Sequence, residues 1–114
     1  MLRWPDDKTV IEAARNWASV LGQQRKDILR IGYFGSYARG DWGVGSDLDL
    51  ILVIDDANAP FHERALQFES PRLPVPAEML VYSAAEWDKL IFESTRFSNM
   101  LKNEARWLYD RGFD

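Results

Sequence analysis

The sequence predicts a mixed fold of the α/β or α+β class, in which a small central sheet packs against helices. Three observations lead to this prediction: a helical period near the N-terminus, three short β-prone runs after it, and a second helical period in the C-terminal third. Elements that alternate in this way bury their apolar faces by packing in layers around one core. The length of 114 residues suits one domain, covering residues 1–114.

The first helix is expected over residues 6–24. Its apolar side chains, represented by Val10 and Leu21, recur every three or four residues and form one stripe. Asp6 or Asp7 is suited to cap the start of this helix, because an aspartate side chain accepts hydrogen bonds from the unpaired N–H groups of a first turn.

Three strands are predicted, at residues 28–34, 47–54 and 78–82. The second begins with an Asp-Leu-Asp sequence and continues as an unbroken apolar run, which is typical of a strand buried on both faces. Side chains alternate between the two faces of a strand, so Asp47 and Asp49 are expected to point the same way.

Residues 61–68 are expected to form a short helix. The prolines of residues 71–76 predict a connection after it, because proline removes a backbone donor and restricts φ. Ser83 and Glu86 match a capping box. They predict a C-terminal helix over residues 84–108, with a kink near its middle at Ser94 and Thr95.

The residues best suited to chemistry lie between residues 31 and 56. The small-residue turn Gly35–Ser36 ends the first strand, where the backbone can approach a ligand closely. Ten residues later come Asp47 and Asp49. Two carboxylates held on one rigid strand repel each other, and a divalent cation relieves that repulsion. Because their ligand atoms are hard oxygens, the expected cation is Mg²⁺.

This pattern of Gly35-Ser36, ten residues and Asp47-x-Asp49 resembles the signature of the DNA polymerase β-type nucleotidyltransferases. The wider stretch from Gly35 to Gly40, GSYARG, also resembles the first motif of that group, in particular of its minimal, antitoxin-type prokaryotic members. The resemblance implies a polymerase β-like palm with a small mixed sheet. It also implies Mg²⁺-dependent transfer of a nucleoside monophosphate, with AMP from ATP expected, to an acceptor hydroxyl.

The resemblance assigns a role to each residue of the motif. Asp47 and Asp49 would hold two Mg²⁺ ions, which in such sites lie ~3.5–4 Å apart. Gly35 and Ser36 would bind the triphosphate through backbone N–H groups and the serine hydroxyl. Arg39 follows Ser36 by three residues on a short helical segment, so it faces the same way and is suited to a bidentate phosphate contact.

Simpler interpretations of the same residues remain open. Ser36 could be only a helix N-cap, and Arg39 only a surface charge. Asp47 could be a turn residue, followed at Asp49 by one solvated strand position. Family members commonly carry a third carboxylate, usually aspartate, on the following strand. The matching residue here is Glu78, which could ligate a metal, act as base toward the acceptor hydroxyl, or be a solvated residue at a strand start.

Composition excludes several other classes of function. The chain has no cysteine, which excludes disulfides, zinc–thiolate sites and thiol nucleophiles. It has one histidine, which excludes a two-histidine metal site within one chain. The formal charge of −4 argues against broad binding to nucleic acid, although a local basic patch remains compatible with it. No apolar run approaches the ~20 residues of a membrane-spanning helix, so no membrane contact is expected and the cytoplasm is the default location.

Two functions are kept. The first is an active nucleotidyltransferase, and the second is an antitoxin-like module that neutralises a HEPN-type RNase by forming a complex with it. The minimal family members that this chain resembles work beside such RNases, which they restrain by binding or by adenylylation. A palm of this length leaves no room for an acceptor-binding domain, so a protein partner or a second copy is expected to complete the cleft.

Overall fold

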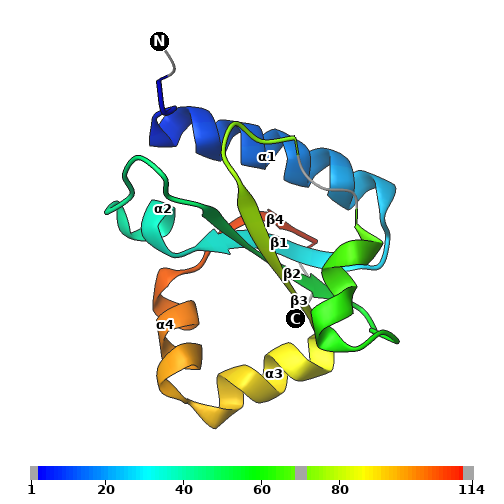
Figure 1. The fold of residues 1–114 in the computed structure, drawn as a ribbon. Helices are drawn as coiled ribbons and strands as arrows, with labels where there is room; N and C mark the ends of the chain where they lie inside the picture. The colour runs from blue at the N-terminus through cyan, green and yellow to red at the C-terminus, as the bar shows by residue number, and fades with distance from the viewer. Residues whose placement is uncertain (1–2, 69–71, 112–114) are drawn as a thin grey trace.

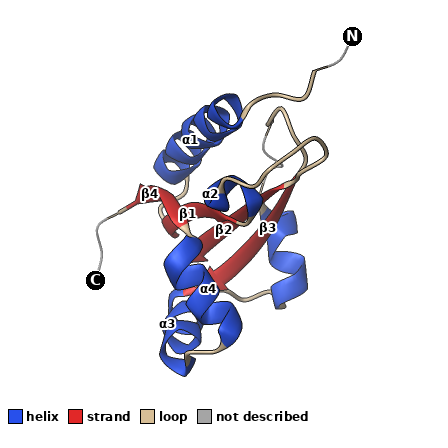
Figure 2. Cartoon of the chain, turned by 90° about the vertical axis from the view of Figure 1, so that its left-hand side faces the viewer, coloured by secondary structure: helices blue, strands red, loops and turns tan. Residues whose placement is uncertain are grey.

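The computed structural model describes residues 3–68 and 72–111, and it places them in a four-stranded sheet with helices on both faces (Figure 1). The strand order is β3-β2-β1-β4. Helix α1 packs on one face, while α3 and α4 pack on the other (Figure 2). The predicted fold class, a small mixed sheet packed against helices, is therefore confirmed.

Helix α1 (Asp7–Gln24) forms as its apolar period predicts. The carboxylate of Asp6 caps it by accepting a hydrogen bond of 2.9 Å from the N–H of Thr9. The buried side of the helix includes Val10 and Leu21 and packs against the sheet. Among the described residues, no helix combines the length and the hydropathy that crossing a membrane would require.

The centre of the sheet is strand β2 (Leu48–Ile54), which starts one residue later than predicted. It pairs antiparallel with β1 (Ile28–Phe34) and parallel with β3 (Ala77–Ser83). Leu50 and Leu52 face the α1 side, and Ile51 and Val53 contribute to the core under α3 and α4. All four side chains are 0% exposed, which confirms the prediction of a strand buried on both faces.

The predicted C-terminal helix is interrupted at the expected place. Helix α3 (Ala84–Glu93) begins with the capping box and ends where Ser94 adopts a left-handed conformation, with φ of 53°. Thr95 then caps α4 (Arg96–Glu104) through a hydrogen bond of 3.1 Å from the N–H of Ser98. The break separates two distinct helices, where the sequence predicted a kink.

Beyond Glu104 the helix prediction is wrong, because Arg106–Asp110 form strand β4, antiparallel to β1. The apolar residues of this segment match a helical period, but so short a run does not distinguish a helix from a strand. The aromatic residues Trp107 and Tyr109 suit a strand. Pairing here also covers an edge of β1 that would otherwise expose its N–H and C=O groups.

The short helix predicted at residues 61–68 is present as a 3₁₀ helix, η1 (Phe61–Gln67). Residues 72–76 connect it to β3 without forming a helix or strand, as predicted. Pro71 belongs to the same predicted connection and lies outside the described residues.

A buried arginine, Arg64, fastens η1 to the rest of the fold. Its Nη2 donates to the carboxylate of Glu86 at 3.0 Å, Nη1 to the carbonyl of Val81 at 3.1 Å, and Nε to the carbonyl of Ala59 at 2.9 Å. The Glu86 carboxylate also accepts from the N–H of Ser83 at 2.8 Å and so closes the capping box of α3. One ion pair thereby joins η1, β3 and α3.

We expect Arg64→Ala to lower the free energy of unfolding by about 2–3 kcal/mol, because two carbonyls and the Glu86 carboxylate lose the hydrogen bonds that Arg64 donates to them. Urea unfolding measures the change. Arg15, exposed on α1, provides the control, and Arg15→Ala should change stability by less than about 0.5 kcal/mol. Equal losses in the two variants would contradict the role assigned to Arg64.

The Arg64–Glu86 ion pair should also make the free energy of unfolding depend on pH in the acidic range. Hydrogen bonds from Arg64 are the main cause that lowers the pKa of Glu86 from 4.5 to about 2. The folded protein therefore binds this proton less readily than the unfolded chain, so the stabilisation is present above about pH 4.5 and is lost as the pH falls toward 2. Unfolding of Glu86→Gln should show a smaller dependence on pH in that window.

Candidate active site

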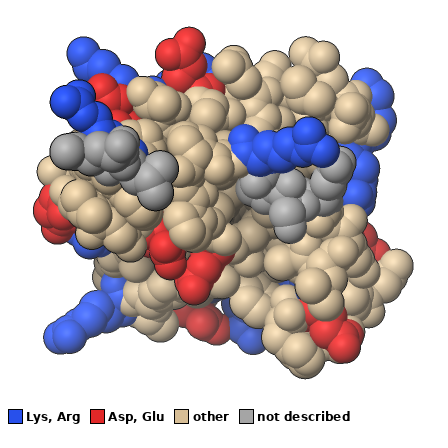
Figure 3. Space-filling model, turned by 45° about the horizontal axis from the view of Figure 1, so that its top comes forward, with Lys and Arg blue, Asp and Glu red and all other residues tan. Residues whose placement is uncertain are grey.

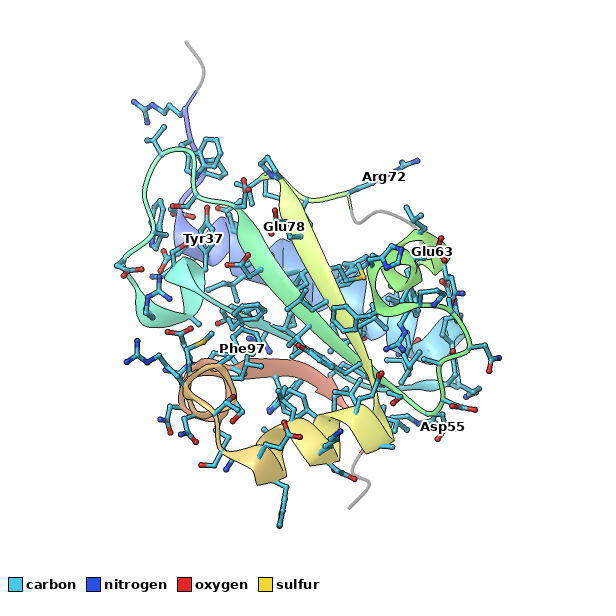
Figure 4. The ribbon with its side chains drawn as sticks, turned by 60° about the horizontal axis from the view of Figure 1, so that its bottom comes forward. Tyr37, Asp55, Glu63, Arg72, Glu78 and Phe97 are labelled. Carbon is cyan, nitrogen blue, oxygen red and sulfur yellow. The ribbon has the colours of Figure 1, made fainter. Side chains whose placement is uncertain are left out.

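The predicted site residues gather where β1 ends and β2 and β3 begin. Asp49 pairs across the sheet with Phe34 on one side and with Glu78 on the other. Because Gly35 directly follows Phe34, this register places the glycine turn next to Asp49. Figure 4 labels Glu78 at this end of the sheet and Asp55, which follows β2, at the opposite end.

Gly35 and Asp49 are in direct contact. A Cβ atom on Gly35 would lie 2.2 Å from Oδ2 of Asp49, far closer than two such atoms can approach, and the φ of Gly35 is +80°. Only glycine tolerates both the contact and this backbone conformation. The structure thus brings the carboxylate of Asp49 against the turn that the sequence assigns to a triphosphate.

Ser36 is the first residue of helix α2 (Ser36–Arg39), whose N-cap is Gly35. The interpretation of Ser36 as a helix N-cap is therefore wrong. Its side chain is half-buried, and its hydroxyl makes no hydrogen bond within residues 3–68 and 72–111. The hydroxyl is therefore available as a donor to a bound ligand.

Asp49 lies among other carboxylates. Burial raises its pKa first, and the negative charges of Glu78 and Asp47 raise it further, while Arg39 opposes them. Glu78 is exposed and stands beside Asp49 in the parallel register, and Asp47 is exposed just before β2. The charges of two acidic residues predicted from sequence, Asp47 and Glu78, thus act on the third, Asp49, at one end of the sheet.

The donor set of this cluster fits a divalent cation. Asp49 is half-buried, and its pKa is raised first by burial and then by neighbouring negative charge, a situation that a bound cation relieves. Its oxygen ligands suit Mg²⁺, which keeps several waters and needs few protein carboxylates. Among the residues that the structure describes, no three His, Cys, Asp or Glu side chains are already arranged around a common metal position.

Arg39 belongs to a network at the same turn. Its Nε donates to Asp41 and its Nη1 to Glu104, each at 3.1 Å, and the N–H of Gly35 donates to the second oxygen of Glu104 at 3.1 Å. The side chain of Arg39 is 47% exposed. Arg39 is thus tied to the glycine turn through Glu104, and it is more than an isolated surface charge.

Sequence reasoning missed Glu104. The sequence predicts this residue inside a long helix, and no local pattern marks it as part of the site. Its position follows from β4, since Arg106 pairs with Tyr33 two residues before the glycine turn. Only the pairing of distant segments brings Glu104 to Gly35.

Aromatic contacts hold the loop that precedes Asp47. The ring of Tyr37 stacks on that of Trp42 with centroids 5.7 Å apart. The Tyr37 hydroxyl accepts from the indole N–H of Trp4 at 3.1 Å and donates to the carbonyl of Ser46 at 3.2 Å. These contacts tie α2 to the residue just before Asp47, so the turn and the acidic pair are held together from two sides.

A match to the nucleotidyltransferase domain family covers residues 16–108. Because this is most of the chain, the protein belongs to that family, whose members transfer nucleotidyl groups. The matched segment contains the glycine turn, the acidic residues and Glu104. No protein among curated ones matches the chain.

Several solved structures are similar to this chain. A candidate nucleotidyltransferase from Sulfolobus solfataricus is 15% identical, with a TM-score of 0.62 over 92% of this chain and 84% of its own. A toxin–antitoxin complex with AMP-PNP is 16% identical over 95% of this chain and 76% of its own, at a TM-score of 0.48. A mutant of the toxin–antitoxin pair MntA–HpeT is 15% identical over 95% of this chain and 75% of its own, at a TM-score of 0.49. The likeness to the first establishes a shared fold.

We expect Asp49→Asn to raise the melting temperature at pH 7 in the presence of EDTA. A raised pKa means that the folded protein binds this proton more readily than the unfolded chain, so the ionised carboxylate lowers stability at neutral pH. The gain should shrink as the pH falls and the wild-type carboxyl becomes protonated. Asp55→Asn, at an exposed position beyond the far end of β2, should have little effect. A lower melting temperature for Asp49→Asn would contradict the destabilising effect assigned to the buried, ionised carboxylate of Asp49.

Proposed function

We propose that this protein is a Mg²⁺-dependent nucleotidyltransferase that transfers AMP from ATP to an acceptor hydroxyl. The observation that carries this proposal is the contact between the Asp49 carboxylate and the Gly35 turn, in a chain of the nucleotidyltransferase family. The contact unites a metal-binding type of side chain with the turn that we propose receives the phosphates. Nucleotidyl transfer requires the metal-binding carboxylate and the triphosphate-binding turn to lie side by side.

In this reaction the acceptor oxygen forms a bond to the α-phosphorus of ATP, and the bond from that phosphorus to the bridging oxygen of the β-phosphate breaks. Pyrophosphate leaves with the electron pair. Asp47 and Asp49 would hold Mg²⁺, which when bound neutralises charge on the phosphate oxygens and activates the acceptor hydroxyl. Glu78, beside Asp49 in the register, is the candidate to add a ligand or to take the proton of that hydroxyl.

The phosphates of ATP would bind to Ser36 and Arg39. The unpaired Ser36 hydroxyl donates to a phosphate oxygen, and the Arg39 guanidinium supplies positive charge. Within residues 3–68 and 72–111, Nη2 of Arg39 has no hydrogen-bond partner, because its bonds use Nε and Nη1. That nitrogen is thus available to a phosphate without breaking the existing network.

The test is transfer of label from α-³²P-ATP with Mg²⁺ to candidate acceptors, including protein partners and the chain itself. Asp49→Asn should lower the rate at least about a hundredfold, the order of loss on removing a preorganised electrostatic group. Asp55→Asn should keep the wild-type rate. Absence of both transfer and nucleotide binding in the wild type would refute the proposal, as would full activity of Asp49→Asn.

A second candidate function is an antitoxin-like module that restrains a HEPN-type RNase by binding it. It is favoured by large apolar side chains that the fold leaves exposed, notably Phe92 on α3, which is 89% exposed, and Leu66 on η1, which is 84% exposed. A hollow of about 240 Å³ between η1 and α3, lined in part by Phe61, Tyr82 and Leu90, adds apolar surface. Contiguous apolar surface, such as the lining of this hollow, is typical of sites that contact other proteins. A second copy of this chain is the alternative occupant.

Neutralisation of a co-expressed HEPN-type RNase from the same organism separates the two functions. If transfer is the physiological activity, Asp49→Asn should lose neutralisation, and the RNase should carry a covalent nucleotide only with the wild type. If binding suffices, Asp49→Asn should keep neutralisation, and Phe92→Ser should lose it. Neutralisation that survives in both variants would contradict both the catalytic account and the role assigned to Phe92.

A further inference from the structure

We propose that Glu104 is a positioning residue of the nucleotide site, whose carboxylate holds the Gly35 turn and the Arg39 guanidinium in the arrangement that receives the triphosphate. This inference rests on the proposed nucleotidyl transfer and adds a residue from the C-terminal part of the chain to that site.

The two oxygens of Glu104 are used separately. Oε2 accepts from the backbone N–H of Gly35 and Oε1 accepts from Nη1 of Arg39, each at 3.1 Å. The side chain is 12% exposed, against 47% for Arg39. A mostly buried carboxylate with a charged partner and a backbone partner makes stronger hydrogen bonds than an exposed surface pair. Glu104 therefore acts as a bracket between the turn and the arginine.

Local helix energetics do not explain a glutamate at this position. Glu104 is the last residue of α4, where the negative end of the helix dipole disfavours a carboxylate. Two residues later Arg106 pairs with Tyr33, and two residues after Tyr33 comes Gly35. Because Glu104 and Gly35 each lie two residues from this strand pair, the pairing fixes the distance between them. The hydrogen bonds that Glu104 makes there offset the unfavourable interaction of its charge with the helix dipole.

The bracket occupies the N–H of Gly35, which is therefore not free for the phosphate contact expected from the sequence, and it leaves the Ser36 hydroxyl and Nη2 of Arg39 available to a ligand. Satisfying the N–H of Gly35 fixes the orientation of a turn that carries no side chain and lies against Asp49. Arg39 donates from Nη1 to Glu104 and from Nε to Asp41. These two hydrogen bonds fix the orientation of its remaining nitrogen, Nη2. Without Glu104 the long arginine side chain would keep only its exposed contact with Asp41, and the nucleotide would have to supply the rest of its ordering, which weakens binding.

The experiment measures the Kd of a non-hydrolysable ATP analogue with Mg²⁺, together with KM and kcat for transfer. Glu104→Ala should raise Kd and KM about tenfold, with a much smaller change in kcat. Glu104→Gln keeps one acceptor oxygen and should recover part of that loss. Arg39→Ala should weaken binding similarly, and the double variant should be little worse than either single one, because the two residues act as a unit.

Glu12, exposed on α1, supplies the matched control, and Glu12→Ala should bind like the wild type. The amide resonance of Gly35 in NMR spectra reports the bracket directly and should shift in Glu104→Ala but not in Glu12→Ala. Should Glu104→Ala fail to fold, Glu104→Gln and Arg39→Ala still decide the question by the same measurements.

Unchanged or tighter nucleotide binding by folded Glu104 variants would overturn the inference, and tighter binding would identify Glu104 as an anion that competes with phosphate. Additive losses in the double variant would also overturn it. A wild type that binds no nucleotide defeats the proposed function, and this inference with it. A wild type that binds, beside variants that bind equally well, defeats only the inference.

Discussion

The contact between Gly35 and the carboxylate of Asp49 organises this end of the molecule. It exists because β1 and β2 pair so that Phe34 faces Asp49, which puts the following glycine directly on the aspartate. Any side chain at residue 35 would occupy the space of that carboxylate. The turn, the first residue of α2 and the acidic pair are therefore parts of one local arrangement, and a shift of the β1–β2 register would separate all of them.

Holding several carboxylates at one sheet edge costs stability, and the burial of β2 offsets that cost. Two like charges 4 Å apart repel by about 1–4 kcal/mol near a protein surface, whereas burying one Val, Leu or Ile side chain contributes roughly 1.5–3 kcal/mol. Strand β2 buries five such residues completely, Leu48 and Leu50 to Val53. The apolar run thus anchors the acidic residues that begin it, and the fold tolerates a charged cluster where a cation and a nucleotide are proposed to bind.

The C-terminal part of the chain contributes more than a cover for the core. Strand β4 closes the outer edge of β1 and carries the end of α4 to the glycine turn, where Glu104 meets Gly35 and Arg39. Helices α3 and α4 pack under the same sheet through Trp87 and Leu101.

The sequence by itself determined the elements with strong local signals: helix α1, the three strands β1, β2 and β3, the capping box, and the motif of Gly35, Ser36, Asp47 and Asp49. These follow from hydrophobic period, turn chemistry and spacing, all of which act within a few residues. Only the tertiary structure decided that Arg106–Asp110 form a strand, because helix and strand periods coincide over so short a run and the unpaired edge of β1 settles the choice. It alone brought Glu104 to the turn, since a contact between residues 35 and 104 depends on strand pairing and leaves no trace in local sequence.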